Sequence, residues 1–123
     1  MLAARSDYPP AHRTEPVDRQ HLARYTLGDI GLENEVLELF ASQLPSLIEG
    51  LKDAPTARER YVAAHTLKGS SRAIGAWKLA ALAEDAERCT AHGEGTIAAE
   101  ILRRIEEHAA ELIAYVAHGM LVT

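Results

Sequence analysis

The sequence is poor in cysteine and in aromatic residues. Among its 123 residues there are one Cys, one Trp, one Phe and four Tyr. Cys89 has no cysteine partner within the chain, so no internal disulfide can form, which is typical of a reducing compartment. With so few aromatic side chains the core must consist of Leu, Ile, Val and Ala, which favours closely packed helices.

Segments that would place the protein in a membrane are also lacking. No apolar run is long enough to span a bilayer, and the first residues lack the sustained apolar stretch of a signal peptide. We therefore expect a cytoplasmic protein with no membrane partner. The formal net charge of -5 argues against nucleic acid as a partner, because an acidic surface repels phosphates.

Motifs for nucleotide and metal chemistry are missing as well. There is no phosphate loop of the Gly-x-x-x-x-Gly-Lys type, so we expect no ATP site and no autophosphorylation. A metal site in a helical bundle would show Glu-x-x-His on two helices, and no such repeat occurs. Cys89 and His92 have a ligand-like spacing but no second cysteine pair, so we predict a partly buried Cys89 and a capping or surface His92. The sequence predicts no cofactor of its own.

Apolar residues recur at helical spacing along most of the chain, and no stretch of useful length reads as a strand. We predict helices over residues 17–27, 32–52, 57–74, 76–91 and 96–118. Thr56 and Glu59 form a capping box before the third helix, Pro45 should bend the second, and Gly119 should cap the last. Residues 28–31 and 93–95 are predicted turns.

These helices predict the fold. Four long amphipathic helices with short connections favour an all-α fold, an antiparallel up-and-down four-helix bundle. The helix over residues 17–27 is a short addition, with Val17, His21, Leu22, Tyr25 and Leu27 on its apolar side. Residues 1–16 carry three prolines among polar residues, which predicts a weakly ordered arm before a bundle domain over residues 17–123.

The third predicted helix has one inward and one outward side. Its inward stripe consists of Ala64, Leu67, Ser71 and Ile74, which are small or apolar. His65, Gly69 and Arg72 lie on roughly the opposite side, with Lys68 at the flank. The imidazole should therefore face water beside two cations.

Gly69 follows His65 by four residues and should lie directly beside it. A glycine inside a helix costs about 1 kcal/mol relative to alanine, and the apolar pattern continues past it, so no turn explains it. We infer that the position leaves room for something to approach the imidazole. A neutral ring nitrogen is a nucleophile and a lysine ammonium offsets phosphate charge, so this site suits a phosphoryl group.

The stretch around His65 resembles the signature of the histidine-containing phosphotransfer (HPt) domains of bacterial multistep phosphorelays. The matching residues are His65-Thr66-Leu67-Lys68-Gly69-Ser70-Ser71, then Gly75-Ala76 and Leu79-Ala80-x-Leu82. The resemblance covers about Val17 to Met120. It implies the fold predicted above, a four-helix bundle with one or more accessory helices.

The resemblance also implies roles for individual residues. His65 would accept and donate the phosphoryl group at Nε2, and Lys68 would contact the phosphate. Family members commonly carry Gln or Glu on the following helix to orient the histidine, and register places Glu87 there. A carboxylate would accept from Nδ1–H and set the tautomer, but it would also favour the imidazolium, which is not nucleophilic.

Other residues near His65 bear on docking. Gly69 gives a receiver domain access, and Val62 and Ala73 would add apolar docking surface. Arg72 either steers an acidic receiver surface or is only a charge at the rim of the site. Ser70 and Ser71 are expected to serve close helix packing.

We expect a phosphocarrier, not an enzyme, that relays a phosphoryl group between aspartates of receiver domains, from a hybrid sensor kinase to a response regulator. Mg²⁺ would belong to the receiver's acidic pocket. A monomer is expected, because the motif helix needs a free face. Two alternatives remain at this point: a receiver-binding helical module without phosphotransfer, and a bundle enzyme or metal protein.

Overall fold

The computed structural model describes residues 15–91 and 95–122. Within these residues the chain forms helices and no strands, which confirms the predicted all-α class. The helices are α1 (Arg19–Thr26), α2 (Ile30–Asp53), α3 (Ala57–Ile74), α4 (Trp77–Ala91) and α5 (Ala99–Val122).

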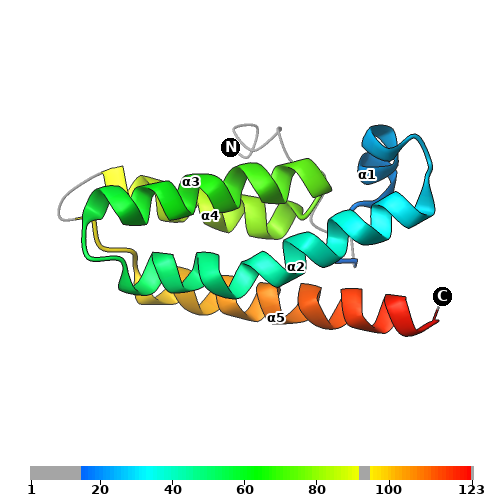
Figure 1. Ribbon diagram of the computed structural model, residues 1–123. Coiled ribbons are helices and arrows are strands. Elements are labelled where there is room, and N and C mark those ends of the chain that lie inside the picture. The colour runs from blue at the N-terminus through cyan, green and yellow to red at the C-terminus, as the bar shows by residue number, and fades with distance from the viewer. Residues whose placement is uncertain (1–14, 92–94, 123) are drawn as a thin grey trace, which may run out of the picture.

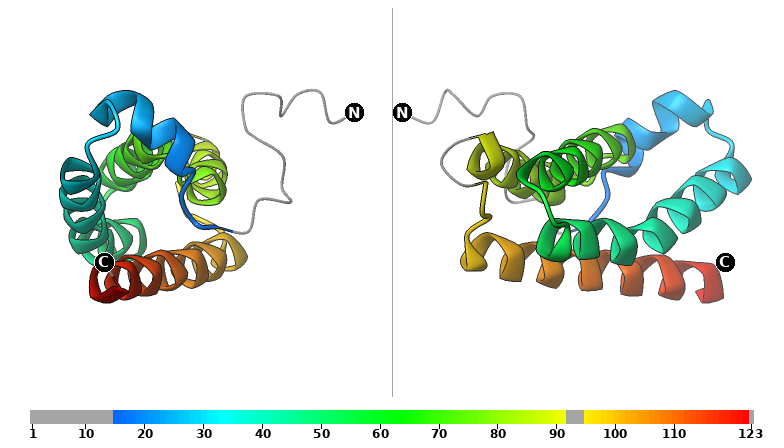
Figure 2. Two further views of the ribbon diagram at one scale, coloured as in Figure 1. Left: turned by 90° about the vertical axis from the view of Figure 1, so that its right-hand side faces the viewer. Right: turned by 60° about the vertical axis from the view of Figure 1, so that its left-hand side comes forward.

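Helices α2 to α5 run alternately up and down and form a bundle (Figure 1). Each long helix packs against two others, in the ring order α2, α3, α4, α5 and back to α2. α3 and α5 therefore lie diagonally opposite one another, as the view along the bundle shows (Figure 2). The short α1 packs at one end, against α2 and α3.

The core consists mainly of aliphatic side chains, as the shortage of aromatic residues predicted. α2 contributes Leu37, Leu44 and Leu51 together with Phe40. α3 buries Ala64, Leu67, Ser71 and Ile74, the four residues of its predicted inward stripe. α4 adds Leu79, Ala80, Ala83, Ala86 and Thr90, and α5 adds Ile105, Ala109, Leu112 and Val116. Alanines in α3, α4 and α5 allow the helices to approach closely.

Local signals set the course of α2 and α3. α3 begins after Thr56, whose hydroxyl accepts from the backbone N–H of Glu59 at 3.1 Å, as the capping box predicted. α2 runs through Pro45 as one helix and bends along its length (Figure 1). Arg60 fixes the entry to α3, because its guanidinium donates to the carbonyl oxygens of Ala54 and Gly95 at 2.8 and 2.9 Å.

The first two helices differ from the expectation at their shared turn. α1 ends at Thr26, because Leu27 adopts a left-handed conformation with φ of 55°. Ile30, predicted in a turn, already begins α2, because Asp29 caps that helix by accepting from the N–H of Leu32.

The predicted apolar side of α1 is partly wrong. Leu22 is buried and Val17 is buried just before the helix, but Tyr25 and Leu27 are 68% and 91% exposed. One side of this short helix covers the end of the bundle, and the rest of it faces water.

The last two helices also differ at their ends. α4 begins at Trp77 rather than at residue 76, and α5 begins at Ala99 rather than at residue 96. α5 continues through Gly119 to Val122, so the predicted cap at Gly119 is wrong. The apolar residues that follow Gly119 in the sequence extend the amphipathic pattern, and the helix continues with them.

Gly75 joins α3, α4 and the N-terminal segment. It ends α3 in the left-handed conformation, with φ of 83°, and its carbonyl accepts from the backbone N–H of Asp18 at 2.9 Å. The Asp18 carboxylate caps α1 and accepts from Nε1 of Trp77 at 3.0 Å. These bonds fasten α1 to the turn between α3 and α4.

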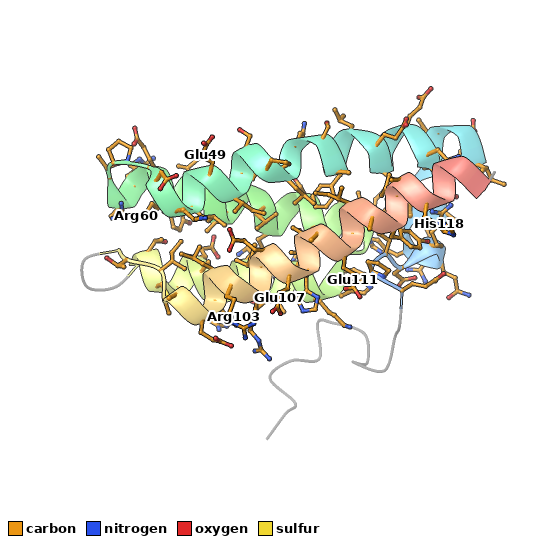
Figure 3. The ribbon with its side chains drawn as sticks, turned by 90° about the horizontal axis from the view of Figure 1, so that it is seen from below. Glu49, Arg60, Arg103, Glu107, Glu111 and His118 are labelled. Carbon is orange, nitrogen blue, oxygen red and sulfur yellow. The ribbon has the colours of Figure 1, made fainter. Side chains whose placement is uncertain are left out.

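The outer surface of α5 is charged. Arg103, Glu107 and Glu111 lie along the side of α5 that faces away from α2 (Figure 3). Arg103 pairs with Glu100 and with Glu107 along the same helix. None of the helices in the described ranges is both long enough and apolar enough to traverse a lipid bilayer.

Candidate functional site

His65 lies on the outer side of α3. In the sequence it stands between Ala64 and Leu67, two buried residues of the inward stripe. Its side chain is 61% exposed, whereas the adjacent Ala64 is fully buried. Gly69, one turn further along, is exposed, and a Cβ added there would meet no atom within 4 Å. The predicted opening beside the imidazole is therefore present in the fold.

Glu87 of α4 holds one edge of the His65 ring. The distance from Nδ1 of His65 to Oε2 of Glu87 is 2.6 Å. A carboxylate accepts, so Nδ1 carries the proton and Nε2 keeps its lone pair in the neutral ring. Nε2 has no hydrogen-bond partner among the residues that the structure describes. The predicted pairing of Glu87 with His65 is present, and it leaves the other nitrogen accessible.

Lys68 binds the same carboxylate. Its Nζ lies 2.6 Å from Oε1 of Glu87, and the side chains of Lys68 and Glu87 are only 16% and 14% exposed. The resemblance implies a contact between Lys68 and the phosphate. The structure joins Lys68 to His65 through Glu87, one carboxylate oxygen for each partner.

The charge state of Glu87 follows from this arrangement. Partial burial alone would raise its pKa, but the hydrogen bonds from Lys68 and His65 favour the carboxylate and outweigh burial. The pKa of Glu87 is therefore lower than its ordinary value. The group stays ionised at neutral pH and accepts from both neighbours.

Tyr61 stacks on His65, a contact that the sequence analysis missed. The ring centroids are 5.8 Å apart and the ring planes differ by 15°. Tyr61 precedes His65 by four residues, so the two side chains lie one above the other on α3. The spacing was visible in the sequence, but surface tyrosines are common and nothing else marked this one.

The predicted docking residues lie around this group. Val62 is 48% exposed and Ala73 is exposed, so both present apolar atoms to solvent on the outer side of α3. Arg72, about two turns beyond His65, is half-buried in the last turn of the helix. All three lie on the helix that carries His65.

The remaining predictions concern residues away from the imidazole. Ser71 is fully buried on the inward stripe, in agreement with a packing role, and Cys89 is partly buried as expected. His92 lies outside the described residues. Within the described ranges, no cluster of three or more His, Cys, Asp or Glu side chains could hold a metal ion.

Comparison with protein families identifies the domain. Residues 35–115, well over half of the chain, match the Hpt domain. Comparisons with curated proteins and with solved structures found no match. The matched range contains His65, Lys68, Gly69 and Glu87, together with most of α2 and α5. The chain therefore belongs to the Hpt domain family, whose members take part in histidine phosphotransfer in phosphorelays.

Proposed function

We propose that the protein relays a phosphoryl group between receiver domains through a phosphohistidine at Nε2 of His65. It would take the group from an aspartate of a hybrid sensor kinase and pass it to an aspartate of a response regulator. The observation that carries the proposal is the imidazole itself, which is bound through Nδ1 to Glu87 and exposed at its other edge.

The transfer needs no proton movement. The lone pair of Nε2 attacks the phosphorus of the donor's aspartyl phosphate, the N–P bond forms, and the P–O bond to the aspartate breaks. The aspartate leaves as a carboxylate. The proton on Nδ1 stays in its hydrogen bond to Glu87, whose negative charge stabilises the positive charge that develops on the ring.

Lys68 has two roles in this proposal. In the structure its ammonium offsets the charge of Glu87, so the ring faces an ion pair and not an isolated carboxylate. The negative charge of Glu87 is thereby partly neutralised beside the ring. When phosphate is present on Nε2, the flexible lysine can also turn one N–H toward the phosphate oxygens.

The surface around His65 supports docking of a receiver. Gly69 leaves the approach open, Val62 and Ala73 add apolar contact area, and Arg72 supplies positive charge opposite an acidic pocket. The Mg²⁺ needed for transfer would be held by that receiver pocket. In this assignment the protein is a carrier and not a kinase.

The test is phosphorylation by a phosphorylated receiver domain in the presence of Mg²⁺. The wild-type protein should acquire a phosphate that is labile in acid and stable in base, as expected of a phosphohistidine. His65→Gln should abolish labelling and leave the far-UV circular dichroism unchanged, because His65 is exposed on α3.

His108→Gln is the matched control. His108 is a partly exposed histidine of α5, and its Nδ1 also faces a glutamate, Glu111, at 3.4 Å. This variant should be labelled like the wild type. Labelling of His65→Gln at the wild-type level would refute the assignment, and a wild-type protein that binds receivers without being labelled would favour the interaction module.

A further inference from the structure

The stack of Tyr61 on His65 adds a second constraint to the imidazole. The hydrogen bond to Glu87 fixes one atom, Nδ1, at 2.6 Å from the carboxylate oxygen. The histidine side chain has two rotatable torsions, and one hydrogen bond restrains only one distance, so the ring can still change its tilt. A second ring at 5.8 Å with planes only 15° apart restricts that change, because tilting the imidazole would break the stack.

The two neighbours of His65 on the outer side of α3 are unlike each other. One turn before it, Tyr61 places an aromatic ring nearly parallel to the imidazole, with the two ring centroids 5.8 Å apart. One turn after it, Gly69 has no side chain, and a Cβ there would meet no atom within 4 Å. The imidazole therefore has an aromatic neighbour on the side of Tyr61 and open space on the side of Gly69.

Tyr61 is placed to serve this purpose. It lies on α3 itself, one turn from His65, so the backbone that holds the two rings is regular helix. Tyr61 is half-buried, whereas His65 is mostly exposed. The more restrained ring can therefore order the more exposed one.

We propose that Tyr61 is a positioning residue for phosphotransfer, which fixes the plane of the His65 imidazole so that Nε2 meets the receiver from the Gly69 side. The inference rests on the proposed function of His65. Glu87 selects the tautomer, and Tyr61 selects the orientation of the ring. Preorganisation of this kind should raise the rate of transfer within the complex without changing how tightly the receiver binds.

The test compares Tyr61→Leu and Tyr61→Phe with the wild-type protein, using a phosphorylated receiver domain at saturating concentration. Tyr61→Leu removes the ring but keeps an apolar side chain of good helix propensity, so it should fold. We expect its transfer rate to fall roughly 3- to 10-fold, the range that one aromatic pair supports, with receiver affinity unchanged. Tyr61→Phe keeps the ring and should restore the wild-type rate.

A spectroscopic measurement separates positioning from a general structural effect. The face of an aromatic ring shields nearby protons, so the carbon-bound imidazole protons of His65 should resonate upfield in the wild type and in Tyr61→Phe. In Tyr61→Leu they should move toward the values of a free histidine. Tyr115→Leu on the diagonally opposite α5 is the control, and it should leave both the rate and these resonances unchanged.

The outcomes are distinguishable. If the wild type is labelled and Tyr61→Leu transfers at the wild-type rate, or if the His65 resonances do not move, the positioning role is wrong while the proposed function stands. A loss of receiver affinity with an unchanged rate at saturation would make Tyr61 a docking residue, which also overturns the inference. If the wild type takes no phosphoryl group, the proposed function fails and this role fails with it.

Discussion

Glu87 binds His65 through one carboxylate oxygen and Lys68 through the other, so the charge of the site depends on three residues together. A glutamine at this position would supply one neutral acceptor and could not bind both partners as an acceptor through two oxygens. The lysine and the glutamate thus form a unit, in which the cation offsets the extra charge that the carboxylate brings beside the imidazole.

Glu87→Gln tests the stabilising effect of this unit. Because the folded-state pKa of Glu87 is lower than its ordinary value of 4.5, the carboxylate contributes stability that is fully present above that pH. The contribution is lost as the pH falls through the lowered pKa. We expect the wild type to exceed Glu87→Gln in free energy of unfolding by on the order of 1 kcal/mol at neutral pH, and the difference to vanish in strong acid.

Urea unfolding at a series of pH values measures this difference. The series runs from neutral pH into strong acid, and the contribution of Glu87 is read from the change in the difference below about pH 4.5, the ordinary pKa of a glutamate. A difference that stays constant down to acid pH would show that the Glu87 carboxylate is not stabilised by its partners.

At the scale of single residues, prediction from sequence succeeded where spacing along one helix was enough. The exposure of His65 and the gap at Gly69 follow from helical periodicity and are present. The pairing of Glu87 with His65 was predicted only through the family resemblance, because the periodicity of a single helix does not determine its register against a neighbouring helix. The Lys68–Glu87 pair was missed for the same reason, since its partner lies on α4.

The elements meet at Gly75, where α3 ends, α4 follows and the segment before α1 crosses. A Cβ at this position would lie 2.9 Å from the Cβ of Asp18 and 3.0 Å from its carbonyl oxygen, and φ is +83°. Both the space and the backbone conformation therefore require glycine. Gly69, by contrast, lies in regular helix with open space around it.

The two glycines predict opposite effects of the same substitution. Gly75→Ala should lower the free energy of unfolding by about 2 kcal/mol or more, through backbone strain and the clash with Asp18. Gly69→Ala should raise it by up to about 1 kcal/mol, because alanine is the better helix former and meets nothing.

Denaturant unfolding with an unchanged m-value measures both changes. Equal effects of the two substitutions would contradict this account of the α3 terminus. A transfer rate of Gly69→Ala below that of the wild type, despite its greater stability, would indicate that the opening beside His65 serves access.

Helix ends were harder to predict than helices. The bounds of α3 were predicted correctly, because Thr56 and Gly75 are strong signals at its two ends. The beginning of α2 was missed, since Gly31 suggested a turn although Asp29 caps the helix. α5 passed through Gly119, where apolar periodicity outweighs the preference of glycine for helix ends.

At the scale of the whole molecule, the single tryptophan lies where the short helix α1 joins the bundle. Trp77 begins α4, donates to Asp18 through Nε1 and contacts the His21 ring, with centroids 4.7 Å apart. Val17 and Leu22 are buried beside this junction. The short α1 is therefore tied to the core and should not unfold separately.

Trp77 fluorescence and far-UV circular dichroism should consequently give the same unfolding midpoint in urea. Fluorescence reports the junction with α1, whereas the circular dichroism comes mainly from the four long helices. Coincident curves are expected of one cooperative unit. A fluorescence transition at lower urea would show that α1 detaches first.

At this scale the fold class and the helical bundle were predictable, because four long amphipathic helices with short links have few other ways to bury their apolar sides. The place of α1 was not. Its docking depends on contacts of Asp18 with Gly75 and Trp77, and Trp77 follows Asp18 by 59 residues, so no local pattern predicts the pairing.

The imidazole and the carboxylate that holds it belong to different helices, and this limits what the motif can do alone. Transplanting residues 64–76 into an unrelated amphipathic peptide would copy His65, Lys68 and Gly69. It would leave Nδ1 of His65 without its hydrogen bond to Glu87, which lies on α4. Such a peptide would display the family's signature and behave as an ordinary surface histidine. If His65 carries the phosphoryl group as proposed, its reactivity depends on how α3 packs against α4, and a small shift between these helices would abolish it without any change in the sequence of the motif.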